Sequence, residues 1–402
     1  MIAAAVLFAL PVFARLSPGD AQARAAAYDS DVRGAVATER EREAALHTAR
    51  VAAVPHVIGD YSLAPQASPN DIATVEQRLF TVGAGINVTD LLLAPSNIRV
   101  AAADVLTAQR DVETAQLAAK RNALKLYFDA LRSMAIEKLQ VRSVSDAARD
   151  LSVARIRARA GDAPQLDVTR AGVALAQAQA ASYRARADRA NAIDALANIA
   201  RVPATSLNTL AEPPGGTPPT QSIERTVARA LADRPELDSL LRAAQARDAT
   251  VSVARQSSYP TATLQAGYAT GVDTSIHVGG PQLAAHLDIP VASNGSAAVV
   301  AARARSEAAY AALDAERRQI ELDATAAVRD VLADNLATDA AARAQTQAAR
   351  VLAGVELGYR EGASSGVDVA EARRTYLQAS VDALTAQYQQ AAATWYVDVV
   401  AP

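Results

Sequence analysis

The sequence predicts a mainly α-helical protein with a small β part, built as two copies of one repeat. The segment RARAGDAPQLDVTRA at 157–171 returns 201 positions later as GYREGASSGVDVAEA at 358–372. Proline and glycine are absent from 96–160, which predicts one helix of roughly 65 residues, on the order of 100 Å long. Aromatic residues make up 4% of the chain and alanine dominates its hydrophobic residues, which favours narrow helix seams over a thick globular core.

The elements follow the same order in each repeat. The first repeat, 24–202, begins in a helix at 18–54 and continues with two strands, the long helix, a turn and a helix ending at 201. The stretch 203–222 is rich in proline and glycine and predicts a linker. The second repeat, 223–402, has a helix at 223–258, strands within 260–291, a long helix at 297–361 and a final helix to 399. Because the offset of 201 holds from the long helix through the turn, the sequence indicates duplication.

Residues 1–23 predict an export signal. The apolar stretch Ile2–Ala14 is too short to span a bilayer, and Ala21-Gln22-Ala23 has the small-x-small form of a cleavage site. No lysine or arginine precedes the apolar stretch, so an ordinary buried N-terminal helix is the alternative.

Composition argues against several functional classes. The net charge of −3 and the lack of a long basic block give no reason to expect a nucleic-acid partner. The chain has no cysteine, so disulfides, thiolate metal sites and a cysteine nucleophile are excluded. Its four histidines lack metal-binding spacing, and no phosphate-binding loop or nucleophile motif is present. We therefore expect no catalytic residue, no metal site and no cofactor.

Four segments, 54–64, 76–93, 259–271 and 276–292, have the character of strands. In the third, Thr261, Thr263 and Gln265 alternate with apolar residues, as in a strand with one lipid-facing and one water-facing side. Four strands cannot close a barrel, and open edges are not tolerated in lipid, so a membrane barrel would need two or three copies of the chain. Two soluble β-hairpins at the end of a helical rod are the alternative.

This order of elements, repeated twice, resembles the outer membrane efflux protein family, also called the TolC family. The segments at 125–139, 234–268 and 359–391 are similar to stretches of that family. The resemblance implies a homotrimer in the outer membrane of a Gram-negative bacterium, extending into the periplasm. Twelve strands would form a β-barrel in the lipid, and the duplicated helical hairpins would form an α-barrel tunnel.

The resemblance also implies a function without catalysis. The trimer would be the passive exit duct of a tripartite efflux or type I secretion system, with a periplasmic adaptor (membrane fusion) protein and an inner-membrane pump as partners. A soluble periplasmic coiled-coil protein, acting as a structural rod or adaptor, is the alternative.

The same resemblance implies roles for the two repeated turns. Gly161 and Gly362 permit tight reversals, and with Ser364 and Ser365 they would form the tips where the adaptor docks. Asp368 and Glu371, spaced i, i+3, match an acidic ring that forms the pore entrance gate.

Asp167 and Tyr359 match positions that tie neighbouring hairpins together, which predicts a tip latch from the Tyr359 hydroxyl to the Asp167 carboxylate. Helix capping is the alternative for Asp167 and Asp368, because both lie in a first helical turn. The spacing Ser365-x-x-Asp368 also resembles a capping box.

Overall fold

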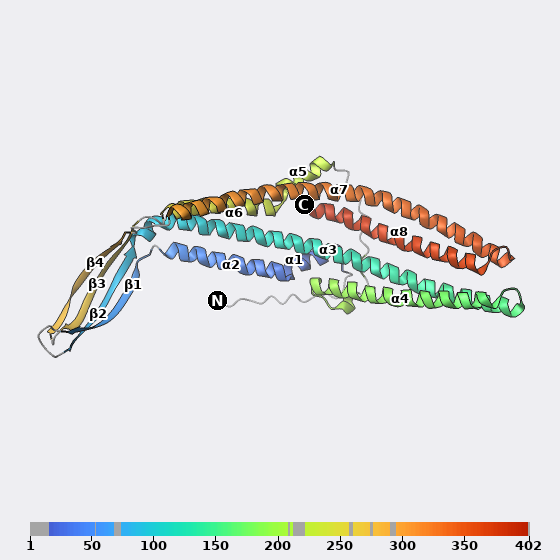
Figure 1. The fold of residues 1–402 in the computed structure, drawn as a ribbon, viewed down its shortest axis with the longest axis horizontal. Coiled ribbons are helices and arrows are strands. Elements are labelled where there is room, and N and C mark those ends of the chain that lie inside the picture. Colours follow the sequence, from blue (N-terminus) through green and yellow to red (C-terminus); the bar gives the residue numbers. More distant parts are fainter. Residues whose placement is uncertain are drawn as a thin grey trace. The chain divides into compact units, whose positions relative to one another are not determined.

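A computed structural model describes residues 16–52, 54–67, 74–207, 210–211, 222–256, 260–273, 276–289 and 295–400 (Figure 1). The first repeat and linker contain α1 (Pro18–Tyr28), α2 (Ser30–Val51), β1 (His56–Ala67), β2 (Thr74–Asn87), α3 (Val88–Ala160), α4 (Gln165–Ala200) and the 3₁₀ helix η1 (Ala204–Leu207). The second contains α5 (Ile223–Asp233), α6 (Pro235–Gln256), β3 (Thr261–Asp273), β4 (Ile276–Asp288), α7 (Gly295–Glu361) and α8 (Gly366–Val400). The expected mainly α fold with four strands is confirmed.

The chain forms two compact units, each drawing on both repeats. Unit 1 comprises Met1–Arg33, Thr114–Arg234 and Arg318–Pro402. It therefore holds α1, α4, α5, α8 and the C-terminal parts of α3 and α7. Unit 2 comprises Gly34–Glu113 and Pro235–Arg317, with most of α2, the strands, α6 and the N-terminal parts of α3 and α7.

The sheet of unit 2 is antiparallel in the order β1-β2-β3-β4. Strand β2 of the first repeat pairs with β3 of the second, so neither repeat completes the sheet alone. At the centre of that pairing Gly83 faces Gly267. A Cβ built on Gly83 would lie 2.8 Å from the Gly267 Cα and 2.5 Å from the Ala266 carbonyl oxygen. Side chains larger than hydrogen therefore do not fit between the two central strands here.

The core of unit 1 surrounds Tyr127 and Leu124 of α3, which are almost fully buried together with Leu196 of α4. The Tyr127 hydroxyl contacts two backbone carbonyls, at 2.9 Å from Leu16 and 2.5 Å from Ala211. Burial is the main cause that raises the pKa of this hydroxyl above its usual range, so the group stays protonated. The N-terminal segment and the linker are thus both held against α3.

Three of the expected helices differ from those in the structure. Helix α3 begins at Val88, before Pro95, because the Asn87 side chain accepts bonds from the N–H groups of Thr89 (3.0 Å) and Asp90 (3.2 Å) and starts the helix there. The proline is accommodated inside the helix at the loss of one backbone hydrogen bond.

The helices expected at 18–54 and 223–258 are each divided in two. The first breaks at Asp29, whose side chain accepts a bond from the Asp31 N–H (2.8 Å) and so initiates α2. The second breaks at Arg234, which has ψ of 121° because the following Pro235 disfavours the helical conformation. Pro235 then opens α6, where its missing N–H costs nothing.

Candidate functional site

The two repeated turns have the same backbone geometry. Gly161 (φ 86°) and Gly362 (φ 82°) are both left-handed, a conformation that favours glycine. In each turn the glycine N–H donates three residues back, at 3.3 Å, and the next residue donates five residues back, to Arg157 (2.9 Å) or Gly358 (2.7 Å). This is the Schellman pattern, which ends α3 and α7 and reverses the chain into α4 and α8.

The helices after the turns are capped differently. Pro164 precedes α4 and provides no side-chain bond, whereas Ser365 precedes α8 and forms the expected capping box. The Asp368 carboxylate accepts bonds of 2.8 Å from both the N–H and the hydroxyl of Ser365. The backbone bond is the larger cause that lowers the pKa of Asp368. Asp368 and Glu371 both remain exposed, so capping and the gate role are compatible.

A groove of about 1040 Å³ lies between the two hairpins of unit 1 and is lined by α3, α4, α7 and α8. The expected latch residues Asp167 and Tyr359 both line it. Asp167 pairs with Arg170 of its own helix (3.5 Å), and its carboxylate oxygen lies 3.3 Å from where a Cβ on Gly366 would be. The direct latch between Tyr359 and Asp167 therefore stays a prediction.

Arg157 connects the two hairpins at the Tyr359 side of the groove. Its guanidinium carbon lies 4.3 Å from the centre of the Tyr359 ring, and Nη1 donates a 2.7 Å bond to the Tyr359 carbonyl. Sequence reasoning missed this residue. The sequence offered one indication of it, because Arg157 lies one turn before Gly161, at the position that Gly358 occupies in the second repeat.

Arg373 of α8 forms the other connection that sequence reasoning missed. Its guanidinium pairs with Asp150 of α3 (2.8 Å), Glu356 of α7 (2.5 Å) and, more distantly, Asp146 of α3 (3.7 Å). The arginine side chain is 20% exposed, and the three carboxylates are each about a third exposed. Three acids from both hairpins thus surround one guanidinium, and Asp146 also pairs with Arg149 of its own helix.

This acidic excess affects Asp150. Burial is the largest cause that raises its pKa; Glu356 and Asp146 raise it further, and Arg373 and Arg149 oppose them. The cluster therefore holds Asp150 closer to neutrality than an exposed aspartate.

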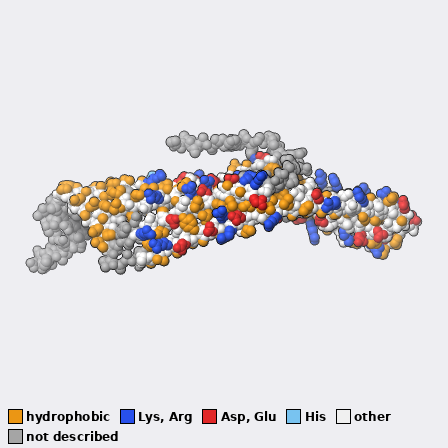
Figure 2. Space-filling view, turned by 90° about the horizontal axis from the view of Figure 1, so that it is seen from above, with side chains coloured by type: hydrophobic (Ala, Val, Ile, Leu, Met, Phe, Trp, Pro, Cys, Tyr) orange, Lys and Arg blue, Asp and Glu red, His pale blue; other side chains and the backbone are white. Residues whose placement is uncertain are grey.

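The sheet of unit 2 separates apolar from polar side chains. Residues paired across an antiparallel ladder point to the same face, so the register places Val57, Tyr61, Phe80, Val82, Leu264, Tyr268, Leu283 and Leu287 on one face. Val57 and Leu283 are 83% and 82% exposed. The opposite face carries Asn87, Thr261, Thr263, Gln265 and His286. Figure 2 shows hydrophobic side chains gathered over the sheet, whereas acidic and basic side chains lie over the helices.

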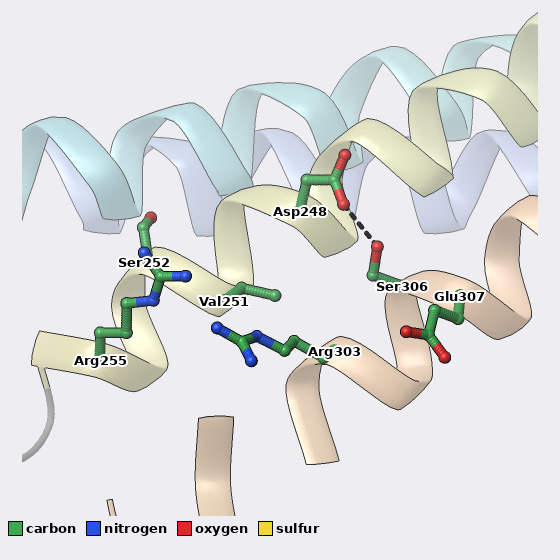
Figure 3. Close-up of a pocket in the computed structure, with 7 residues that line it drawn as sticks. All are labelled: Asp248, Val251, Ser252, Arg255, Arg303, Ser306 and Glu307. Carbon is green, nitrogen blue, oxygen red and sulfur yellow. Dashed lines mark hydrogen bonds between the residues drawn. The ribbon is translucent and has the colours of Figure 1, made fainter. Parts of the chain in front are cut away.

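Helices α6 and α7 are joined in unit 2 beside a pocket of about 300 Å³ (Figure 3). The Asp248 carboxylate accepts a bond from the buried Ser306 hydroxyl and another, of 2.7 Å, from the Tyr310 hydroxyl. Arg255 and Arg303 line the same pocket with Glu307. With two acids and two arginines the lining is balanced in charge, which suits a structural connection between helices.

Part of the chain matches a known protein family. Residues 22–200 match the model of the family described as Outer membrane efflux protein. A sequence search among curated proteins found no significant relative.

Several solved structures share the fold over nearly the whole chain. The Campylobacter jejuni CmeC outer membrane channel is 18% identical, with a TM-score of 0.81 and coverage of 95% of this chain and 84% of that one. The Neisseria gonorrhoeae MtrE outer membrane channel, solved in its open state, is 19% identical, with a TM-score of 0.79 and coverage of 96% and 90%. The outer-membrane channel OprN is 17% identical, with a TM-score of 0.82 and coverage of 96% and 90%.

These comparisons agree with the duplicated hairpins and the four-stranded sheet. Residues 22–200 thus match the Outer membrane efflux protein family, and the chain as a whole has the fold of these outer-membrane channels.

Proposed function

We propose that three copies of this chain form the passive exit duct of a tripartite efflux or type I secretion system. The observation that carries the proposal is the four-stranded sheet with one apolar face and with β1 and β4 at its edges. Lipid does not tolerate open strand edges, so β1 of one copy pairs with β4 of the next. Three copies give a barrel of twelve strands, and its apolar face contacts the hydrocarbon.

The hairpins of unit 1 extend into the periplasm and form the tunnel. Their tips receive the periplasmic adaptor at Gly161, Gly362, Ser364 and Ser365, and the adaptor connects them to the inner-membrane pump. The turns support this role because their rigid Schellman geometry exposes the loop residues after each glycine.

The tips also carry the gate and the latch. Asp368 and Glu371 lie exposed within the first two turns of α8, so three copies bring six carboxylates to the pore entrance. A ring of carboxylates attracts cations. In the closed state the Tyr359 hydroxyl donates a bond to the Asp167 carboxylate across the groove that both residues line.

Single-channel conductance in a planar bilayer tests this function. We expect a small, cation-selective conductance in the wild type and reduced cation selectivity in Glu371→Gln and in the double variant Asp368→Asn/Glu371→Gln. Ser365→Ala removes the capping hydroxyl and keeps both charges, so it should leave selectivity unchanged. Asp339→Asn, an exposed acid of α7 remote from the tip, is the matched control. A protein that remains in solution without detergent and never conducts would contradict the proposal.

A further inference from the structure

The first described residues are integral to the core of unit 1. Leu16 forms a parallel bridge with Leu210 of the linker, and its carbonyl accepts a 3.1 Å bond from the Ala211 N–H. The same carbonyl lies 2.9 Å from the Tyr127 hydroxyl. The chain at Leu16 is therefore fixed between the linker and the long helix α3.

Helix α1 is equally well fixed. Ser17 and Asp20 form a capping box, in which the Asp20 N–H donates to the Ser17 hydroxyl (3.1 Å) and the Ser17 N–H donates to the Asp20 carboxylate (3.2 Å). Ala21 and Ala25 are 0% exposed and belong to the core cluster around Tyr127. The helix is thus fixed both by its N-terminal cap and by its buried face.

Cleavage after Ala23, as the small-x-small pattern at 21–23 predicts, would remove most of this structure. The cap, Leu16 and the segment 18–23 would be lost, and α1 would keep only 24–28, too short to hold a helix. The cluster around Tyr127 would lose Ala21, and Leu210 of the linker would lose its bridge partner Leu16.

We propose that the export signal is instead cleaved after Ala14, so that the mature protein begins at Arg15 and retains α1. The apolar stretch from Ile2 ends at Ala14, and Val12 precedes it by two positions, which gives the short side chains that a signal cleavage site requires. Residues 1–15 lie outside the described residues, so the inference rests on the packing of Leu16 to Ala25. It also rests on the proposed function, because a channel of the outer membrane must be exported.

Intact mass and N-terminal sequencing of the full-length protein, expressed in a Gram-negative host and extracted from the outer membrane, test the cut. We expect Arg15 as the first residue. A mature protein that begins at Arg24, or one that retains residues 1–14, would overturn the proposal.

Two variants make the test independent of folding, because signal cleavage can be read from precursor mass. Ala14→Leu should cause accumulation of the uncleaved precursor. Ala23→Leu, at an exposed position of α1, should be processed as the wild type is. The reverse pattern, with precursor accumulating in Ala23→Leu, would show that the cut lies at 23.

The unfolding temperatures of two chains with different N-termini test the role of Leu16 and α1 in the fold. Two chains, one beginning at Arg15 and one at Arg24, are exported behind the same unrelated signal peptide. The chain from Arg15 should unfold at the wild-type temperature, and the chain from Arg24 should unfold at a lower temperature or be degraded. Equal stability of the two chains would contradict the role given to Leu16 and α1.

Discussion

The guanidinium of Arg157 stacks on the ring of Tyr359, 4.3 Å from its centre, and donates a hydrogen bond to the Tyr359 carbonyl. That carbonyl also accepts the Gly362 N–H (3.3 Å), so the contact supports the second tip turn directly. Arg157 lies in the last turn of α3 and Tyr359 in the last turn of α7. One side chain therefore joins the ends of the two long helices.

Removal of this side chain should loosen the tips. A cation–π contact contributes about 0.5–1 kcal/mol and a hydrogen bond about 1 kcal/mol, so Arg157→Met should cost roughly 1–2 kcal/mol. Because the chain has no cysteine, spin labels at Asp162→Cys and Ala363→Cys report the distance between the two turns without background. The distance distribution should broaden in Arg157→Met.

The matched control is Arg159→Met, because Arg159 is exposed and its Nε donates to the Arg155 carbonyl of its own helix (3.3 Å). Its distance distribution should match the wild type. If Arg157→Met and Arg159→Met gave the same distribution, Arg157 would not connect the hairpins.

The Arg373 cluster should respond unequally to loss of its cation and loss of one acid. Arg373→Met leaves Asp150 and Glu356 without this partner, whereas Asp146 keeps Arg149, and it should cost roughly 1–3 kcal/mol, less than a fully buried pair because the acids are a third exposed. Asp150→Asn leaves Arg373 paired with Glu356 and should be neutral or stabilising at pH 7. Urea unfolding in detergent measures both; a larger loss in Asp150→Asn would contradict this reading.

The pH dependence follows from the raised pKa of Asp150. The folded state binds this proton more tightly than the unfolded state does, so the contribution of Asp150 to stability is greatest when the group is protonated. That contribution decreases as the pH rises from the ordinary carboxyl pKa through the raised value. Asp150→Asn should therefore unfold with a weaker dependence on pH in this interval, and an unchanged dependence would show that another group is responsible.

The glycine pair at the centre of the sheet should not tolerate a larger side chain. A Cβ on Gly267 would lie 2.7 Å from the Val82 carbonyl oxygen and 2.9 Å from the Gly83 Cα, and backbone atoms cannot move aside as a flexible side chain can. Gly267→Val should separate β2 from β3 and reduce the amount of folded protein in the outer membrane. Gly280→Val, at a position of β4 with open space around it, is the control and should be recovered at the wild-type level.

Asp248 should matter more than its exposed neighbour in the α6–α7 pocket. Asp248→Ala leaves the buried Ser306 hydroxyl without its acceptor, and an unsatisfied buried group costs about 1–3 kcal/mol. Glu307→Ala changes the same net charge at an exposed position and should have little effect on the unfolding free energy. Equal losses in the two variants would indicate that charge, not hydrogen bonding, is what Asp248 supplies.

The architecture could be predicted from the sequence because it depends on local signals. The absence of proline and glycine from 96–160 predicted a long helix, and the repeated Gly161 and Gly362 predicted the turns. The starts of helices were harder to predict. Asn87 and Asp29 start helices through side-chain bonds to nearby N–H groups, and the same side chains can also form such bonds in other local conformations.

The contacts between hairpins could not be predicted in the same way. Arg373 is one of many arginines in alanine-rich helices, and nothing near it in the sequence indicates that Asp150, 223 positions earlier, is its partner. Such a pairing depends on the rotation of each helix about its axis, which accumulates over the whole length of α3 and α7. The strand pairing of β2 with β3 across the two repeats is non-local for the same reason.

The offset of 201 between the turns also constrains how this gene can change. Each residue added to or removed from α3 between Thr114 and Arg157 would turn the remaining helix by about 100° and shift it by about 1.5 Å. Arg157 would then point away from Tyr359, and Asp150 away from Arg373. A substitution in a long helix thus affects only the contacts of its own side chain. A single-codon insertion or deletion would misalign every contact that the helix makes beyond it. We expect length variation among natural variants to accumulate in the linker and between paired strands, and the two hairpins to keep a constant length.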